Sequence, residues 1–267
     1  MKSSSITITS SCTLLGDQAD WGGAMMPVLA EIFRSVIEEF NHAVGVNPRR
    51  FLYIQPDLGW GHPQCSKSGK NYTIYLSARE NYWSKYIYQF AHEYCHFLID
   101  GPLDGKLETT FWFEESICEL ASMFFLKKVT ERWQSWFPVL IPGTPLSSKD
   151  DALLRLKQFT PSNLSYLDDL LKKNDPSWEP LYEWIDDNMA LLSEPIYHRD
   201  MYNQIAARMY ELFLDYPDLW RVIPCLQRPS AEEYTGFKSF AKNTLRARVG
   251  NSVKHLSVLI ACLTGEA

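Results

Sequence analysis

The stretch QFAHEYCHFLID, residues 89–100, lies in a segment without Gly or Pro that runs from residue 81 to residue 99. The length of this segment favours a helix over a strand, and the breaker DGPLDG follows it directly. Inside it, His92, Glu93 and His96 form the pattern H-E-x-x-H among aromatic and aliphatic residues. The sequence therefore predicts a helix that carries two histidines among apolar side chains.

The residues before this helix predict a small sheet and one further helix. Residues 5–9 (SITIT) and 51–55 (FLYIQ) are short runs typical of strands, and residues 72–78 (YTIYLSA) alternate in a way that suits a third strand. Residues 26–40 carry apolar side chains at helical spacing. Gly and Pro interrupt residues 56–70, which we expect to form a loop.

The residues after it predict helices almost throughout. A second uninterrupted segment, residues 112–133, is again long enough only for a helix. Pro, Gly and Ser mark residues 140–148 (LIPGTPLSS) as the expected boundary between lobes. Beyond this boundary the expected helices are residues 164–173, 178–192, 202–214, 219–226, 231–246 and 252–263.

Together these elements predict an α+β fold. A lobe of residues 1–140 holds the small N-terminal sheet and the two long helices, and a mostly helical C-terminal lobe of residues 141–267 completes a cleft. The length of 267 residues allows one large domain or two small lobes of this kind.

Charge and composition argue against several classes of protein. A formal net charge of -6 and a pI near 5.6 are unsuited to binding a phosphate backbone, which needs a basic face, so we expect no nucleic-acid partner. The first twenty residues lack the apolar core of a signal peptide, and no run of about 18 apolar residues occurs. We therefore expect a cytoplasmic protein without a membrane partner; the oligomeric state stays open.

The cysteines give no sign of a disulfide framework. They are scattered without a C-x-x-C pair, at positions 12, 65, 95, 118, 225 and 262. We interpret them as small buried hydrophobic residues in a reducing compartment, with Cys65 in a polar loop as the most exposed thiol.

The spacing of the two histidines is that of a metal site. Residues four apart lie on the same face of a helix, so His92 and His96 can direct their imidazoles at one metal ion. Glu93 lies about 100° round the helix from His92, beside the metal but outside the ligand positions. There it can take a proton from a metal-bound water, which is what hydrolysis requires.

A third ligand is expected from the next helix, which contains FWFEESICELAS at residues 111–122. Carboxylates in such an apolar helix need a partner. Glu115 and Glu119 are four apart and share a face with Cys118, which indicates that they point inward. Glu114 lies on the neighbouring strip, where a solvated position is the simplest interpretation.

With these residues the chain resembles the gluzincin metallopeptidases, in which H-E-x-x-H on one helix is completed by a Glu from the next. Eighteen residues separate His96 from Glu115, and this interval with Trp112 three residues before the Glu is similar to the alanyl aminopeptidase branch. The resemblance implies one Zn²⁺ per chain, held by His92, His96 and Glu115. It also implies that Glu119 accepts the N–H of a ligand histidine, a position where the family often has Asp.

The resemblance also implies a zincin-like fold and a substrate-binding side of the site. The strand at residues 72–78 resembles the gluzincin edge strand, which lies beside the active-site helix and binds extended substrate by strand addition. In the family a Tyr or His of the C-terminal lobe stabilises the developing oxyanion. Residues 194–220 are similar in outline to that stretch, with Tyr202 as the best match and Tyr197 and His198 as alternatives.

One departure from the aminopeptidases limits the inference. They carry a Gly-x-Met-Glu-Asn motif ahead of the metal helix, whose Glu binds the free amino terminus of the substrate. Here the corresponding residues 61–78 read GHPQCSKSGKNYTIYLSA and contain no such motif. Aminopeptidase activity therefore does not carry over, and the resemblance covers roughly residues 72–125 with further support near Tyr202.

The leading expectation is a zinc-dependent hydrolase that cleaves a peptide bond in a peptide or protein substrate, with Glu93 as general base. A second reading keeps the metal but drops catalysis, so that zinc stabilises a binding or regulatory protein. Structural zinc is usually four-coordinate with Cys and His, and a carboxylate beside the metal adds nothing to such a site. A third reading has no metal and two core histidines.

Overall fold

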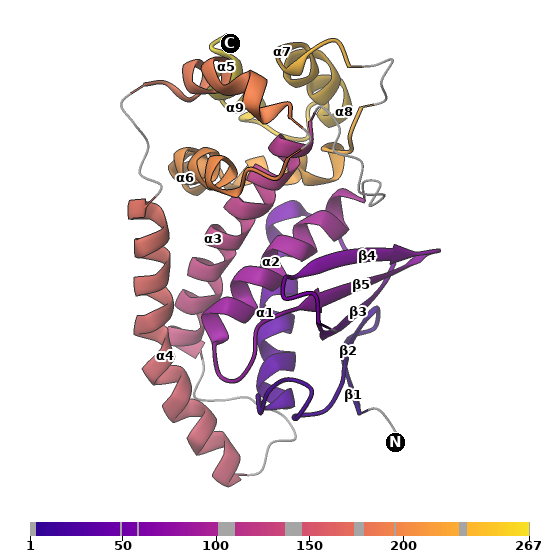
Figure 1. Cartoon of the computed structure of the whole chain (residues 1–267), viewed down its shortest axis with the longest axis vertical. Coiled ribbons are helices and arrows are strands. Elements are labelled where there is room, and N and C mark those ends of the chain that lie inside the picture. Colours follow the sequence, from indigo (N-terminus) through magenta and orange to yellow (C-terminus); the bar gives the residue numbers. More distant parts are fainter. Residues whose placement is uncertain are drawn as a thin grey trace. The chain divides into compact units, whose positions relative to one another are not determined.

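The computed structural model describes residues 4–48, 50–57, 59–100, 110–136, 146–173, 179–194, 196–229 and 234–266. Of residues 134–136 and 146–159 it describes the backbone alone. A mixed five-stranded sheet is combined with helices (Figure 1), so the predicted α+β class is confirmed. The chain separates into two compact units, residues 1–42, 46–94 and 122–170 in the first and residues 43–45, 95–121 and 171–267 in the second. Because these units interleave along the sequence, the predicted lobes 1–140 and 141–267 stay a prediction.

The first unit contains the sheet, in the order β1-β2-β3-β5-β4. Its strands are β1 (Ser5–Thr9), β2 (Cys12–Leu15), β3 (Phe51–Pro56), β4 (Gln64–Ser68) and β5 (Asn71–Leu76). The central pairs β2 with β3 and β3 with β5 are parallel, whereas β1 and β4 pair antiparallel at the two ends. The predicted strands at residues 5–9, 51–55 and 72–78 are thereby confirmed in position.

Two details of the predicted sheet are wrong. The expected loop at residues 56–70 contains β4, whose Cys65 is buried and not an exposed thiol. Because β4 pairs with β5 from Gln64 opposite Tyr75 to Ser68 opposite Asn71, β5 is an interior strand. The edge strand on this side of the sheet is therefore β4 and not the stretch YTIYLSA.

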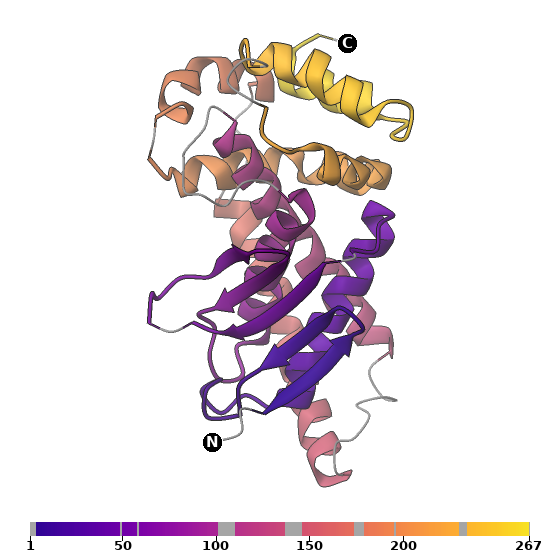
Figure 2. The same cartoon turned by 90° about the vertical axis from the view of Figure 1, so that its right-hand side faces the viewer.

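One face of the sheet is packed and the other is more open. Side chains alternate along β3, where Leu52 and Ile54 are buried and Tyr53 between them is half-buried. Figure 2 shows the strands in front with helix α1 (Met26–Val44) behind them. On that helical side Phe33 of α1 meets Phe90 with 4.7 Å between ring centroids. This aromatic contact joins α1 to the helix that contains Phe90.

The helix of the opening stretch, α2 (Trp83–Ile99), forms where the sequence predicts it. It ends because Asp100 adopts a positive φ of 56° and donates its backbone N–H to the carbonyl of His96 at 3.1 Å. A left-handed residue of this kind closes many helices. The next helix, α3 (Phe111–Trp136), confirms the second predicted segment and is followed by α4 (Leu146–Lys173). Of the predicted boundary at residues 140–148, residues 140–145 lie outside the described part of the chain. The last three residues belong to the start of α4.

The second unit is helical in its C-terminal part, as predicted. Its elements are α5 (Leu181–Leu192), α6 (Arg199–Asp215), the 3-10 helix η1 (Pro217–Cys225), α7 (Phe237–Ser239), the π-helical turn η2 (Phe240–Leu245), α8 (Arg246–Val249) and α9 (Leu256–Thr264). In Figure 1, α5 and α9 lie side by side. The helix predicted at residues 231–246 begins at residue 237, with residues 231–233 outside the described part. Within the described residues, no helix is long and apolar enough to cross a membrane.

Asp218, in the first turn of η1, fastens the start of α9. Its Oδ1 lies 2.6 Å from Nδ1 of His255, and its Oδ2 accepts the backbone N–H of His255 at 3.2 Å. Burial raises the pKa of Asp218, but these hydrogen bonds outweigh burial and lower the pKa below its ordinary value of 3.8. The carboxylate therefore binds its proton less tightly in the folded protein than in the unfolded chain.

Replacing Asp218 with Asn should lower the free energy of unfolding by about 1 kcal/mol at neutral pH. The pKa of Asp218 is lower in the folded protein than in the unfolded chain. Its contribution to stability is therefore complete above pH 3.8, the ordinary pKa, and is lost as the pH falls through the folded pKa. Urea unfolding at a series of pH values should give a variant whose free energy of unfolding is lower than that of the wild type by a constant amount near neutral pH. This difference should become smaller in acid. The exposed neighbour Asp215, changed to Asn, is the control and should show no such difference. A difference that widened on acidification would contradict this account.

Candidate metal centre

His92, Glu93 and His96 lie in the middle of α2, in a buried environment. Their exposed fractions are 8%, 5% and 8%, which leaves all three side chains largely out of water. The residues between and around them are large and apolar, so the rotamers of the imidazoles are restricted by packing, as a preorganised site requires. The sequence prediction of a buried helix with both histidines on one face is therefore confirmed.

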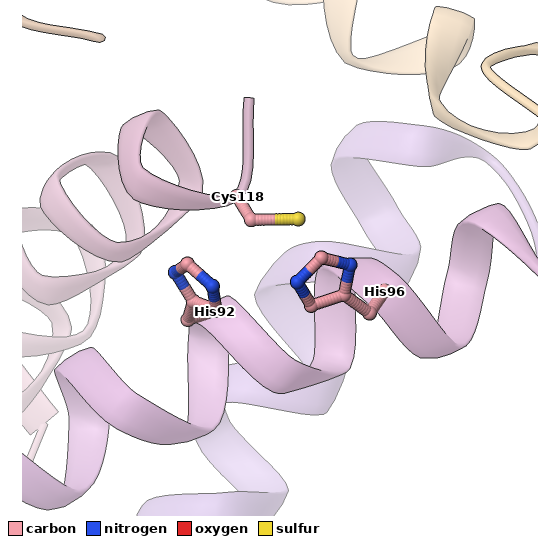
Figure 3. A group of neighbouring side chains, drawn as sticks. All are labelled: His92, His96 and Cys118. Atoms are coloured by element: carbon pink, nitrogen blue, oxygen red, sulfur yellow. The ribbon is translucent and has the colours of Figure 1, made fainter. Parts of the chain in front are cut away.

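A cysteine of α3 completes a group that could hold a metal ion. One ligand atom each from His92, His96 and Cys118 lies within 4.8 Å of the others, and all three residues are buried. Figure 3 shows the two imidazoles side by side on α2 and the sulfur of Cys118 facing them. Imidazole nitrogen and thiolate sulfur are both ligands that zinc accepts. Cys118 had been interpreted from the sequence as a buried hydrophobic residue.

The predicted third ligand, Glu115, contacts one member of this group, His96. Its Oε1 is 3.2 Å from Nε2 of His96. Two ligands bound at roughly 2.0–2.1 Å to one tetrahedral zinc ion are about 3.3 Å apart, so these two atoms have the spacing of neighbouring ligands. The contact is a direct hydrogen bond, and its spacing is also that of two neighbouring zinc ligands.

The other nitrogen of His96 is held by Glu114, which the sequence interpretation had placed in solvent. Oε1 of Glu114 lies 2.8 Å from Nδ1 of His96, and Glu114 is only 2% exposed. Its second oxygen, Oε2, accepts a hydrogen bond from Nε of Arg228 at 2.9 Å. The solvated position is therefore wrong, because two buried polar partners hold the carboxylate inside.

These contacts shift the pKa values of His96 and Glu114 so that both side chains favour their charged forms. Burial lowers the pKa of His96, but the charges and hydrogen bonds of Glu115 and Glu114 outweigh it and raise this pKa well above its ordinary value. Burial raises the pKa of Glu114, but His96 and Arg228 outweigh burial and lower it. The carboxylate at Nδ1 thus stays ionised, and a metal bound at Nε2 would replace a proton there.

Glu119, predicted to accept the N–H of a ligand histidine, is completely buried one turn beyond Glu115. Its Oε1 lies 3.2 Å from Nε of Arg199, at the start of α6. The predicted hydrogen bond from Glu119 to a histidine stays a prediction. The histidine contact that the structure does describe is made by Glu114.

The three candidates for stabilising an oxyanion are placed differently. Tyr197 is 47% exposed and shares a side-chain hydrogen bond with Glu115. Tyr202, the best match from the sequence, is 1% exposed, and its hydroxyl donates to the backbone carbonyl of Ile196 at 3.3 Å. His198 precedes α6, with Nε2 at 3.7 Å from Glu194. Of the three, Tyr197 is described with a hydrogen bond to a candidate ligand, and the charge of Glu115 also acts on Tyr202.

The phenol of Tyr197 is kept protonated by its surroundings. Burial of the hydroxyl, followed by the negative charges of Glu115 and Glu119, raises the pKa of Tyr197 above its ordinary value. Its ring packs against Tyr202 with 5.2 Å between centroids and against Phe111 at 6.3 Å. A partly exposed, protonated phenol with a fixed ring can act as a hydrogen-bond donor.

Three residues of this centre were not assigned to it from the sequence, namely Glu114, Cys118 and Arg228. Cys118 lies three residues after Glu115 on the inward face of α3, so helical spacing alone could have included it. Glu114 directly precedes Glu115 and required knowledge of its partners. Arg228 follows η1, far along the chain, and no local pattern marks it.

Comparison with known proteins adds no family to this picture. No protein-family model matches the chain, and neither the curated proteins nor the solved structures contain a match. The interpretation of the centre therefore depends on its own residues and their geometry.

Proposed function

We propose that the protein is a zinc-dependent hydrolase that cleaves peptide bonds. The observation that carries this proposal is the 3.2 Å separation between Nε2 of His96 and the carboxylate of Glu115, beside a second buried histidine. Two imidazoles and one carboxylate are the protein ligands of many hydrolytic zinc sites, which leave a fourth position open. The buried Glu93 next to His92 supplies the general base that such a site needs.

In this proposal His92, His96 and Glu115 would hold the zinc ion. Bound there, zinc would supply a Lewis acid that activates a water molecule at neutral pH. Glu93 would accept a proton from the attacking water and pass it to the leaving amine. The protonated phenol of Tyr197 would donate a hydrogen bond to the oxygen on which negative charge develops. Tyr197 takes this role in place of Tyr202, because Tyr197 hydrogen-bonds the candidate ligand Glu115, whereas the hydroxyl of Tyr202 donates to the backbone carbonyl of Ile196.

The resemblance to the gluzincins supports the class of reaction. The H-E-x-x-H pattern is on a helix, and the glutamate at the family's spacing meets its second histidine. The edge strand for an extended substrate would now be β4, which ends the sheet on the side of β5. Main-chain groups on the outer side of such a strand can pair with a peptide. The cysteines are all free thiols, which supports the cytoplasm as the compartment.

The proposal predicts about one zinc ion per purified chain, measured by elemental analysis. A chelator should remove the zinc and abolish the cleavage of a pool of peptides prepared from a digested proteome, followed by mass spectrometry. Added zinc should restore both. The variant His96→Ala should bind no zinc and cleave nothing, whereas His42→Ala, on α1, should match the wild type. A wild-type protein without zinc would contradict the proposal.

A second function is favoured by one observation, the presence of Cys118 in the metal group. With His92, His96 and Glu115, the sulfur of Cys118 would make four ligands and close the site. A closed, four-coordinate site is typical of zinc that stabilises a fold, so the protein would then be a non-catalytic binding or regulatory protein. Zinc without cleavage of any peptide in the pool would support this alternative.

A further inference from the structure

We infer that Arg228 is a positioning residue for the metal ligand His96 and acts through Glu114. This inference rests on the proposed metal site and adds a residue to it from a distant part of the sequence. Three side chains form the chain of contacts, with Nε of Arg228 at 2.9 Å from Oε2 of Glu114 and Oε1 of Glu114 at 2.8 Å from Nδ1 of His96. Each oxygen of the carboxylate thus has its own partner.

The first link fixes the orientation of His96. A histidine that donates Nδ1–H to a carboxylate presents Nε2 to the metal, and such partners orient the ring and raise its basicity. In this structure Nε2 of His96 faces Glu115 at 3.2 Å, as this arrangement requires. Without Glu114 the ring would lose the contact that keeps Nε2 toward the candidate ligands.

The second link keeps Glu114 in place. Glu114 is 2% exposed, and a buried carboxylate is costly unless it is paired and hydrogen-bonded. The guanidinium of Arg228, whose side chain is itself only 6% exposed, supplies a positive charge and a donor at this point. Removing Arg228 would leave a buried charge without this compensation, and Glu114 would move or rotate away from His96.

Arg228 is held in turn by an aromatic ring. Its guanidinium carbon lies 5.2 Å from the centroid of Phe111, at the start of α3. Phe111 also contacts the ring of Tyr197, the proposed donor to the oxyanion. Planar stacking on a ring together with directional pairing to a carboxylate suits Arg and not Lys. Arg228 therefore bridges the support of a metal ligand and the ring cluster around Tyr197.

The second unit offers a matched arginine that lacks this connection. The side chain of Arg208 is 4% exposed, and its guanidinium lies 5.1 Å from the ring of Trp184 and 3.7 Å from a carboxylate oxygen of Glu179. Arg208 thus resembles Arg228 in burial, ring contact and acidic partner, but Glu179 is not a partner of His96 in the described contacts. A variant at Arg208 controls for the general effect of removing a buried arginine.

The test measures zinc affinity by competition with a chromophoric chelator, together with the thermal unfolding of each variant in excess chelator. We expect Arg228→Met and Glu114→Gln each to weaken zinc binding by about 10- to 100-fold. If Arg228 acts through Glu114, the double variant should bind zinc no more weakly than Glu114→Gln alone. Arg208→Met should bind zinc like the wild type, even where its unfolding temperature falls.

The outcomes separate this inference from the proposed function. Wild-type zinc affinity in a folded Arg228→Met protein would overturn the inference and leave the metal site standing. Losses that multiply in the double variant would also overturn it, because the two residues would then act independently. A wild-type protein that binds no zinc would overturn both. If Arg228→Met does not fold, Arg228→Lys keeps the charge but lacks the planar group, and unchanged zinc affinity in that variant would overturn the inference.

Discussion

Replacing Glu93 with Gln is expected to slow peptide hydrolysis by about 100-fold or more while zinc stays bound. The amide has nearly the shape of the carboxylate but cannot accept a proton from water. Glu93 lies beside the proposed ligand His92 and is not itself a proposed ligand, so the metal content should remain near one zinc per chain. The rate is measured on the peptide that the wild type cleaves fastest in the proteome-derived pool.

The same measurement excludes a trivial loss of structure. Glu211→Gln, at an exposed position of α6, is the control and should keep both zinc and the wild-type rate. If Glu93→Gln cleaved the peptide as fast as the wild type, Glu93 would not be the base. If it lost zinc, Glu93 would be a ligand or a support of one, and the proposed division of roles would be wrong.

The helical part of the centre was predictable because its signals are local. His92 and His96 share a face of a helix that could be predicted from the absence of Gly and Pro within it and from the breaker after it. The structure confirms the helix and its end at Ile99. The interval of eighteen residues between His96 and Glu115 likewise spans one connection between two helices. Regular spacing along helices is the kind of information that a single sequence carries.

The errors concern features that depend on partners far along the chain. The sequence of strand β4, QCSKS, lacks the apolar–polar alternation that marks a strand, and only Cys65 in it is buried. The strand forms because it pairs with β5. Glu114 was placed in solvent because an isolated helix cannot show that Arg228 and His96 converge on one carboxylate. The contacts of the Tyr197 and Tyr202 hydroxyl groups, which differ, were likewise not readable from the sequence.

The identity of the third ligand leads to the prediction that most sharply separates a catalytic site from a closed one. Glu115→Gln is expected to weaken zinc binding by more than the roughly 10- to 100-fold typical of an outer-shell partner, because it removes a direct ligand. Cys118→Ser should bind zinc like the wild type and keep peptide hydrolysis. The reason is that the proposed catalytic site holds zinc with His92, His96 and Glu115 and leaves the fourth position to water, so the sulfur of Cys118 is not one of its ligands.

Cobalt in place of zinc makes the same distinction visible, because a thiolate bound to Co²⁺ gives a strong charge-transfer absorption in the near ultraviolet and a carboxylate does not. The wild-type protein loaded with Co²⁺ is expected to lack this band. Cys12→Ser, at a buried thiol on β2, controls for the loss of a sulfur, and Glu131→Gln controls for the loss of a carboxylate on the same helix as Glu115. A charge-transfer band that disappears in Cys118→Ser, combined with zinc binding that weakens in both Cys118→Ser and Glu115→Gln, would show ligation by His92, His96, Glu115 and Cys118. The site would then be closed in the manner of structural zinc, and the non-catalytic function would replace the hydrolase.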